Sequence, residues 1–125
     1  MERHRLNTFQ ISKHFNLKEF ECPCCHTVKL SPDLVKLLEK IRKKIGKPIV
    51  ISSGYRCPLH NEAVGGKPHS YHLKGMAADI VVPRFSPVEL GRIAHEVGAP
   101  TVIVYPSRGF VHIDVRRRGL GLIGG

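Results

Sequence analysis

Residues 101–116, TVIVYPSRGFVHIDVR, contain two apolar stretches that a short polar segment separates. β-Branched and aromatic residues dominate both stretches, and the PSRG between them is typical of a hairpin turn. In the second stretch Val111, Ile113 and Val115 alternate with His112 and Asp114, so the two sets of side chains point to opposite faces. The segment therefore predicts two antiparallel strands with one apolar face and one face that bears a histidine and an aspartate.

Two helices are expected before this hairpin. The first begins at Ser31-Pro32, an N-cap followed by proline, and ends at Gly46. Its apolar residues recur at helical spacing and form one stripe: Leu34, Leu37, Leu38, Ile41 and Ile45. The second helix begins at Ser86-Pro87 and ends at Gly98 by the same signals.

Residues 48–53 and 76–82 are short apolar stretches that predict two further strands. Residues 54–71 are rich in Gly, Pro, His and Asn and predict a long irregular loop, which in a small domain is usually functional. We expect residues 1–20 to form a wrapping arm with one short helix near Leu17, and residues 117–125 a flexible tail. The whole chain, 1–125, then forms one α+β domain, a small, mainly antiparallel sheet with helices packed on one side.

The chain is strongly basic. It has 20 Lys and Arg against 10 Asp and Glu, a formal net charge of +10 that favours polyanionic partners such as nucleic acid, anionic lipid or a bacterial wall. Trp is absent and aromatics make up 6%, which argues against a stacking platform for single-stranded nucleic acid. The first helix carries basic residues that predict either a solvated face or a patch for wall or nucleic acid: Lys36, Lys40, Arg42, Lys43 and Lys44.

The four cysteines suggest a metal site. Cys22 and Cys25 form C-x-x-C, and Cys57 with His60 forms C-x-x-H, which together make a candidate structural Cys3His zinc site. Cys24 is then left over or substitutes for a neighbour. Two alternatives stay open at this stage: reduced thiols that bind no metal, or one disulfide to Cys57.

Polar residues inside or beside apolar strands form a second candidate site. His72, Asp79, His112 and Asp114 qualify, and burying them without partners would be costly. Two histidines and a carboxylate are a normal ligand set for catalytic zinc, which keeps a fourth position for water. The alternative is an ordinary buried His–Asp hydrogen-bond pair.

Three blocks of the sequence resemble the M15 zinc peptidases. Residues 70–79, SYHLKGMAAD, match the family signature S-x-H-x-x-G-x-A-x-D. SSGYRCPLHN at 52–61, followed by VGG at 64–66, looks like the segment upstream of it, and FVHIDVR at 110–116 resembles the C-terminal motif. This family contains D-alanyl-D-alanine carboxypeptidases, phage endolysins and relatives with the hedgehog fold. The resemblance runs from about Leu17 to Arg116 and is nearest to the family's short subgroup found in bacteria and phages.

The resemblance implies a hedgehog/DD-peptidase-like α+β fold with the metal in a groove on the sheet. It implies His72, Asp79 and His112 as ligands of a catalytic Zn²⁺. By the same resemblance, Arg56 binds substrate and polarises its carbonyl, and Ser70 orients substrate or a ligand. Gly75 permits the tight turn between two ligands. His69 is a further candidate for contact with the substrate.

The general base is the point at which the chain departs from the family pattern. Many relatives carry an acidic residue a few positions before the last histidine ligand, whereas PSRGFV precedes His112 here. Elimination among the ten acids leaves Asp114 and Glu62. Asp114 is preferred because it shares a strand face with His112, and the alternative is that it orients a ligand or an arginine.

The leading hypothesis is a monomeric zinc peptidase that cleaves peptidoglycan stem peptides, as D,D-carboxypeptidase, endopeptidase or endolysin. A hedgehog-like zinc-bearing module that binds the cell wall without catalysis is the alternative. A nucleic-acid binder would leave the His/Asp set unexplained, so no specific nucleic acid is expected. No apolar run reaches the roughly 20 residues of a membrane span, and MERHRLNTFQISKHF shows no signal peptide. Access to a wall would then need phage or prophage lysis, or non-standard export.

Overall fold

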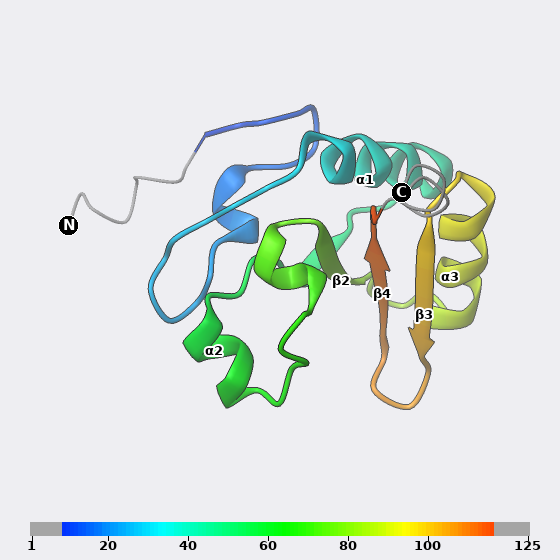
Figure 1. The fold of residues 1–125 in the computed structure, drawn as a ribbon. Coiled ribbons are helices and arrows are strands. Elements are labelled where there is room, and N and C mark those ends of the chain that lie inside the picture. The colour runs from blue at the N-terminus through cyan, green and yellow to red at the C-terminus, as the bar shows by residue number, and fades with distance from the viewer. Residues whose placement is uncertain (1–8, 117–125) are drawn as a thin grey trace, which may run out of the picture.

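The computed structural model describes residues 9–116, and the expectations for residues 1–8 and for the tail at 117–125 lie outside them (Figure 1). The helices in chain order are η2 (Leu17–Phe20), α1 (Pro32–Ile45), α2 (Pro58–Ala63), η3 (Tyr71–Lys74) and α3 (Pro87–Glu96). The strands are β1 (Val50–Ser53), β2 (Ala77–Val81), β3 (Thr101–Tyr105) and β4 (Phe110–Asp114). No described helix has the length and apolar character that crossing a membrane requires.

The strands form one antiparallel sheet in the order β1-β2-β4-β3. The expected hairpin is present, with Tyr105 opposite Phe110 at its closed end. Strand β4 also pairs with β2, and this pairing places Asp79 directly opposite His112. Two segments that lie 33 residues apart in the chain thus present their polar side chains side by side.

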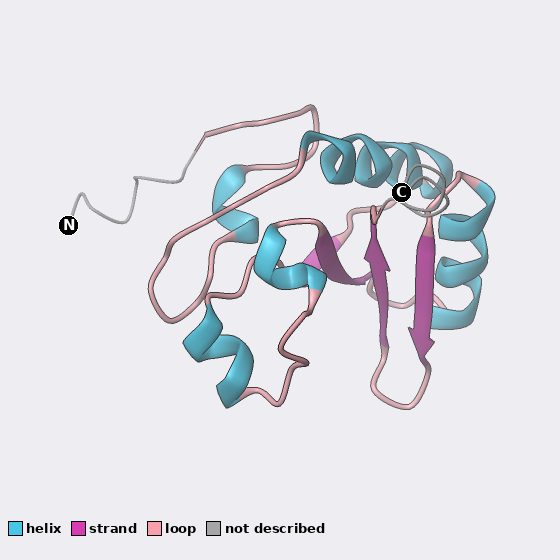
Figure 2. Ribbon diagram, in the orientation of Figure 1, coloured by secondary structure: helices cyan, strands magenta, loops and turns pink. Residues whose placement is uncertain are grey.

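One face of the sheet is the core face. Ala78 and Ile80 of β2 and Val111 and Ile113 of β4 are fully buried there. Helices α1 and α3 pack against this face (Figure 2), with buried side chains that include Leu34, Leu37, Leu38, Ile41, Leu90, Ile93 and Ala94. The α+β architecture with helices on one side is therefore confirmed, and the opposite face is left for the polar residues.

The helix ends follow the capping signals in the sequence. Ser31 accepts a hydrogen bond from the Asp33 N–H at the start of α1, and Gly46 ends this helix in the left-handed conformation. Ser86 caps α3 by accepting from Glu89 N–H. The expectation of an irregular loop over 54–71 is wrong in part, because α2 lies inside it and η3 begins at its last residue, Tyr71. Cys57 caps α2 and a proline follows it, but the helix has only six residues, too few to show an apolar period.

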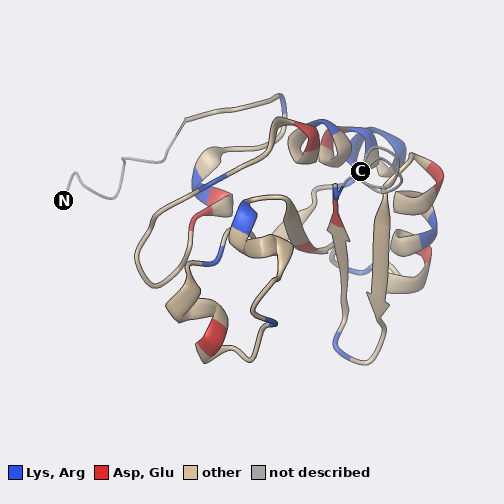
Figure 3. Cartoon of the chain, viewed as in Figure 1, with Lys and Arg blue, Asp and Glu red and all other residues tan. Residues whose placement is uncertain are grey.

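Two aromatic rings from the described part of the N-terminal segment, residues 9–20, belong to the core. Phe15 and Phe20 are buried, with their ring centroids 6.1 Å apart. Lysine and arginine residues are concentrated along α1 (Figure 3), and Lys36, Lys40, Lys43 and Lys44 are exposed. This exposure is compatible with both interpretations, a solvated face and a patch for wall or nucleic acid.

Candidate metal centre and its cleft

Three different elements bring the candidate ligands together. His72 belongs to η3, Asp79 to β2 and His112 to β4. Ser70 caps η3 by accepting a hydrogen bond from the His72 N–H, and Gly75 ends it in the left-handed conformation with φ +69°. This sharp turn returns the chain into β2, so His72 comes close to Asp79. One ligand atom from each of His72, Asp79 and His112 lies within 4.8 Å of the other two.

Hydrogen bonds set which ring nitrogen of each histidine faces Asp79. The Nδ1–H of His72 donates to the Gly54 carbonyl at 2.8 Å, which leaves Nε2 to face Asp79 Oδ1 at 3.3 Å. His112 has the opposite orientation: its Nδ1 lies 3.0 Å from Asp79 Oδ1, and its Nε2 lies 2.9 Å from Asp114 Oδ2. Nε2 of His72, Nδ1 of His112 and Oδ1 of Asp79 therefore converge on one point.

The donor set fits zinc. Two imidazole nitrogens and one carboxylate oxygen are ordinary ligands of a catalytic Zn²⁺, and each histidine has its other nitrogen held by an oxygen, as metal-binding histidines usually do. His72 is 2% exposed and Asp79 7%, so the group is shielded from bulk water on the sheet side. The structure thus brings together the three residues that the sequence suggests as metal ligands.

Charge pairing dominates the electrostatics of this group. Burial raises the pKa of Asp79, but hydrogen bonds from His112 and His72 outweigh it and lower the pKa to about 2. Burial lowers the pKa of His112, but its bonds to Asp114 and Asp79 outweigh burial and raise the pKa to about 9. Asp79 therefore stays ionised, as a metal ligand must be.

Asp114 lies behind His112, away from Asp79. Its carboxylate is fully buried and accepts hydrogen bonds from both sides: His112 Nε2, and Arg116 Nε and Nη2 at 2.8 and 2.7 Å. Burial raises the pKa of Asp114, but the hydrogen bonds from Arg116 and His112 outweigh it and hold that pKa far below its usual range. Arg116 in turn stacks on Tyr71, with Cζ 4.4 Å from the ring centroid. In this arrangement Asp114 orients a candidate ligand, His112, and an arginine.

Arg56 makes three contacts with the protein. Its Nη2 donates to Asp79 Oδ2 at 3.3 Å, Nε to Ser53 Oγ at 3.1 Å, and Nη1 to Asn61 Oδ1 at 3.1 Å. Asn61 is buried and is itself held by the Lys67 carbonyl. Arg56 thus orients the second oxygen of Asp79, and two of its five N–H groups remain for another acceptor.

A cleft of about 860 Å³ opens over the three ligands. Arg56, His69 and Ser70, the expected substrate contacts, line it. Other cations in the lining come from the loop after α2, the β3–β4 turn and the end of the described chain: Lys67, Arg108 and Arg116. Among the described residues, Asp79 is the only carboxylate that lines this cleft, so Asp114 and Glu62 are not in its wall.

The cysteines gather elsewhere, with a different fourth donor from the one expected. Sulfur atoms of Cys22, Cys24, Cys25 and Cys57 lie within 4.8 Å of one another. His60 is not in this group and lines the cleft instead, so the Cys3His combination is replaced by four thiols. Burial opposes ionisation of Cys22, but hydrogen bonds from Cys57 and Cys24 outweigh it and lower its pKa to about 6.

Three contributors had no assigned role in the sequence prediction. Arg116 follows His112 and Asp114 at alternate positions of the sequence. This alternation could have indicated that the three side chains share one face. Asn61 and Tyr71 had no such signal, because their contacts to Arg56 and Arg116 depend on where α2 and η3 lie in the folded chain.

Comparison with known proteins agrees with this geometry. A family model described as Peptidase M15 matches residues 13–114, a span that includes the three candidate ligands, Arg56 and Asp114. A search of curated proteins found no match. The family match covers most of the sequence and ends at the last residue of β4, and the chain therefore belongs to the M15 peptidases.

Proposed function

We propose that this chain is a zinc-dependent peptidase that cleaves the stem peptides of peptidoglycan. The observation that carries the proposal is the convergence of His72, Asp79 and His112 on one point at the base of a cleft, in a chain of the M15 family. Zinc held by three protein ligands supplies an activated water and polarises a carbonyl.

The charge of the cleft favours an acidic peptide. Among the described residues, Arg56, Lys67, Arg108 and Arg116 line the cleft together with a single carboxylate, Asp79, which already contacts two histidines and an arginine. Stem peptides of peptidoglycan carry free carboxylates, which arginine binds well. The basic charge of the whole chain also suits an anionic wall, and we place the site of action there, reached by phage lysis or non-standard export.

The residues that hold the candidate ligands have defined roles in this proposal. Asp79 is held by Arg56 and His112 by Asp114, so both ligands are oriented before substrate arrives. The two unused N–H groups of Arg56 are available to the oxygen of the scissile carbonyl or to a substrate carboxylate. Because its carboxylate lies behind His112, Asp114 acts by positioning that ring. Proton exchange with the peptide then belongs to a group in the lining, for which His69 is the candidate.

Mass spectrometry of purified peptidoglycan fragments tests the proposal. Fragments from several wall types are incubated with zinc-loaded protein, with chelator-treated protein and with His72→Ala. We expect new peptides only with the zinc-loaded wild type, and their masses identify the bond that is cut. Cleavage that survives both the chelator and His72→Ala would contradict a metal-dependent reaction at this centre.

A second candidate is a zinc-bearing module that binds the wall without cleaving it. One observation favours it: the described lining of the cleft holds no carboxylate free to act as a base. Binding of the protein to insoluble peptidoglycan, with no new peptides released from any wall type, would support this candidate over the enzyme.

A further inference from the structure

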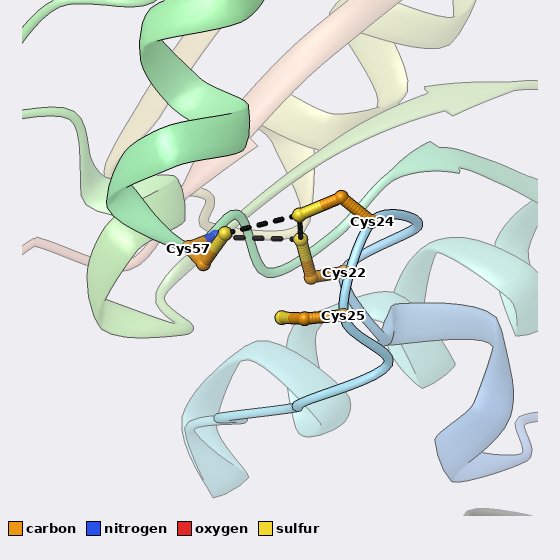
Figure 4. A group of neighbouring side chains, drawn as sticks. All are labelled: Cys22, Cys24, Cys25 and Cys57. Atoms are coloured by element: carbon orange, nitrogen blue, oxygen red, sulfur yellow. Dashed lines mark hydrogen bonds between the residues drawn. The ribbon is translucent and has the colours of Figure 1, made fainter.

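Four thiols from two distant parts of the chain meet in a second group, separate from the His72 group. Three come from the loop at residues 22–25, and the fourth is Cys57 at the start of α2 (Figure 4). Cys24 Sγ lies 3.2 Å from Cys57 Sγ and 3.5 Å from Cys22 Sγ. All four are free thiols in the structure, so no disulfide joins the two segments.

The loop is shaped to present its thiols together. Backbone hydrogen bonds from Cys22 N–H to the Thr27 carbonyl and from His26 N–H to the Cys22 carbonyl, both 2.8 Å, close it into a tight turn. His26 adopts a positive φ of 61° within that turn. The sulfur atoms of Cys22, Cys24 and Cys25 consequently face the same space as the sulfur of Cys57 (Figure 4).

Backbone N–H groups also point at these sulfurs. Cys57 N–H donates to Cys22 Sγ at 3.5 Å, and His60 N–H donates to Cys57 Sγ at 3.4 Å. Such contacts stabilise negative charge on sulfur, which a thiol needs in order to bind a metal. Tetrahedral zinc with Zn–S bonds of about 2.3 Å requires sulfur atoms about 3.8 Å apart, well inside the 4.8 Å limit of this group.

We propose that Cys22, Cys24, Cys25 and Cys57 bind a second zinc ion, with a structural role. Four thiolates form a closed tetrahedral set with no position left for water, which is the pattern of structural rather than catalytic zinc. The ion joins the loop after η2 to Cys57, the residue that directly precedes α2. Because Arg56 immediately precedes Cys57, the ion also fastens the backbone that carries Arg56 toward Asp79.

Cobalt substitution tests the donor set directly on the wild-type chain. The protein is stripped of metal under reducing conditions and titrated with Co²⁺, and absorption is followed. Thiolate ligands give an intense sulfur-to-cobalt charge-transfer band in the near ultraviolet, which a His/Asp site does not produce. We expect this band to saturate within two equivalents of cobalt in the wild type and at one equivalent in His72→Ala, and to disappear when Zn²⁺ is added. This readout is independent of peptidase activity.

Matched variants separate the two metal centres. The wild type should hold two zinc ions per chain, and His72→Ala and Cys57→Ser one each. His72→Ala should keep the full cobalt–thiolate band, and so should His60→Ala, since His60 is outside the thiol group. In the His72→Ala background a chelator should lower the melting temperature and expose four thiols to a thiol reagent.

Several results would overturn the second site. They are the lack of a cobalt–thiolate band in the reduced wild type, a band that is lost in His60→Ala, and a disulfide to Cys57 in protein purified without reductant. Failure of the peptidase assay would leave this site untouched, because none of these measurements uses a substrate.

Discussion

The carboxylate of Asp114 holds the Nε2 atom of His112 at 2.9 Å, on the side of the ring opposite the nitrogen that faces the candidate metal position. A carboxylate in this place orients the imidazole and increases its basicity. It cannot also reach a water in the cleft, since it is fully buried and Arg116 occupies its remaining hydrogen-bonding positions. The geometry thus favours a positioning role for Asp114 over that of general base.

Replacement of Asp114 distinguishes these two roles. We expect Asp114→Asn to weaken zinc binding about 10- to 100-fold, which is typical when the partner of a ligating histidine is lost. Activity should then return at saturating zinc. Zinc affinity measured by competition with a chromophoric chelator, together with kcat at high zinc, checks this. A variant with unchanged zinc affinity and no turnover would instead assign Asp114 as the base.

Replacement of Arg56 by lysine should lower the catalytic efficiency. A lysine keeps the charge but cannot contact Ser53, Asn61 and Asp79 at once, as the guanidinium does. Loss of one charge-assisted hydrogen bond costs about 1.5–3 kcal/mol, so Arg56→Lys should lower kcat/KM about 10- to 100-fold. Steady-state kinetics on the cleaved peptide measures this.

A control for that substitution is available on the helix surface. Arg92 pairs with Glu89 and Glu96 on the exposed side of α3, so Arg92→Lys should leave kcat/KM near the wild-type value. Zinc affinity adds a second readout. If Arg56→Lys binds zinc as tightly as wild type, Arg56 acts on the substrate and does not serve to hold Asp79.

The hairpin and the helix caps could be predicted because each depends on local sequence, and the three candidate ligands stood out as polar residues within or beside apolar strands. Alternation along β4 separates His112 from Val111, and Ser-Pro before an apolar stripe starts a helix. The donor set of the cysteine cluster could not be predicted in the same way. Whether Cys24 or His60 faces the other thiols depends on the left-handed turn at His26 and on the direction of α2, neither of which local spacing determines.

Gly75 and Gly46 make a matched pair for testing how tightly the turn before β2 is packed. Both end a helix with nearly the same positive φ, +69° and +71°. A Cβ at Gly75 would lie 2.3 Å from the Lys29 carbonyl oxygen, whereas a Cβ at Gly46 would meet nothing within 4 Å. Gly46→Ala should therefore lower the unfolding free energy only by the cost of placing alanine in the left-handed conformation, about 1–2 kcal/mol.

Gly75→Ala should lower the unfolding free energy by more, because the clash adds about 1–3 kcal/mol to the cost of the left-handed conformation. The clash also displaces the turn between His72 and Asp79, so zinc affinity should fall in this variant alone. Denaturant unfolding of both variants measures the difference. Equal losses of unfolding free energy in the two variants would show that the turn before β2 can shift to accommodate the added methyl group at no further cost.

Glu39 ties the N-terminal arm to α1 and should make stability depend on pH. Its carboxylate accepts hydrogen bonds from the Ser12 hydroxyl and from the backbone N–H of His14, and it lies 2.7 Å from His14 Nδ1. Burial raises the pKa of Glu39, but the hydrogen bonds from His14 and Ser12 outweigh it and hold the pKa below its ordinary value of 4.5. A depressed folded-state pKa stabilises the fold above the unfolded pKa, and this contribution is lost as the pH falls through the folded value.

Glu39→Gln should accordingly lower the unfolding free energy by about 1–2 kcal/mol at neutral pH, with a deficit that shrinks below about pH 4. Urea unfolding of the two proteins at several pH values measures this deficit. Glu96→Gln is the control, since Glu96 pairs with Arg92 on an exposed surface where water screens the interaction, and its effect should be smaller. A deficit that stays constant down to the acid-unfolding limit would mean that Glu39 stabilises the arm through shape and not through its charge.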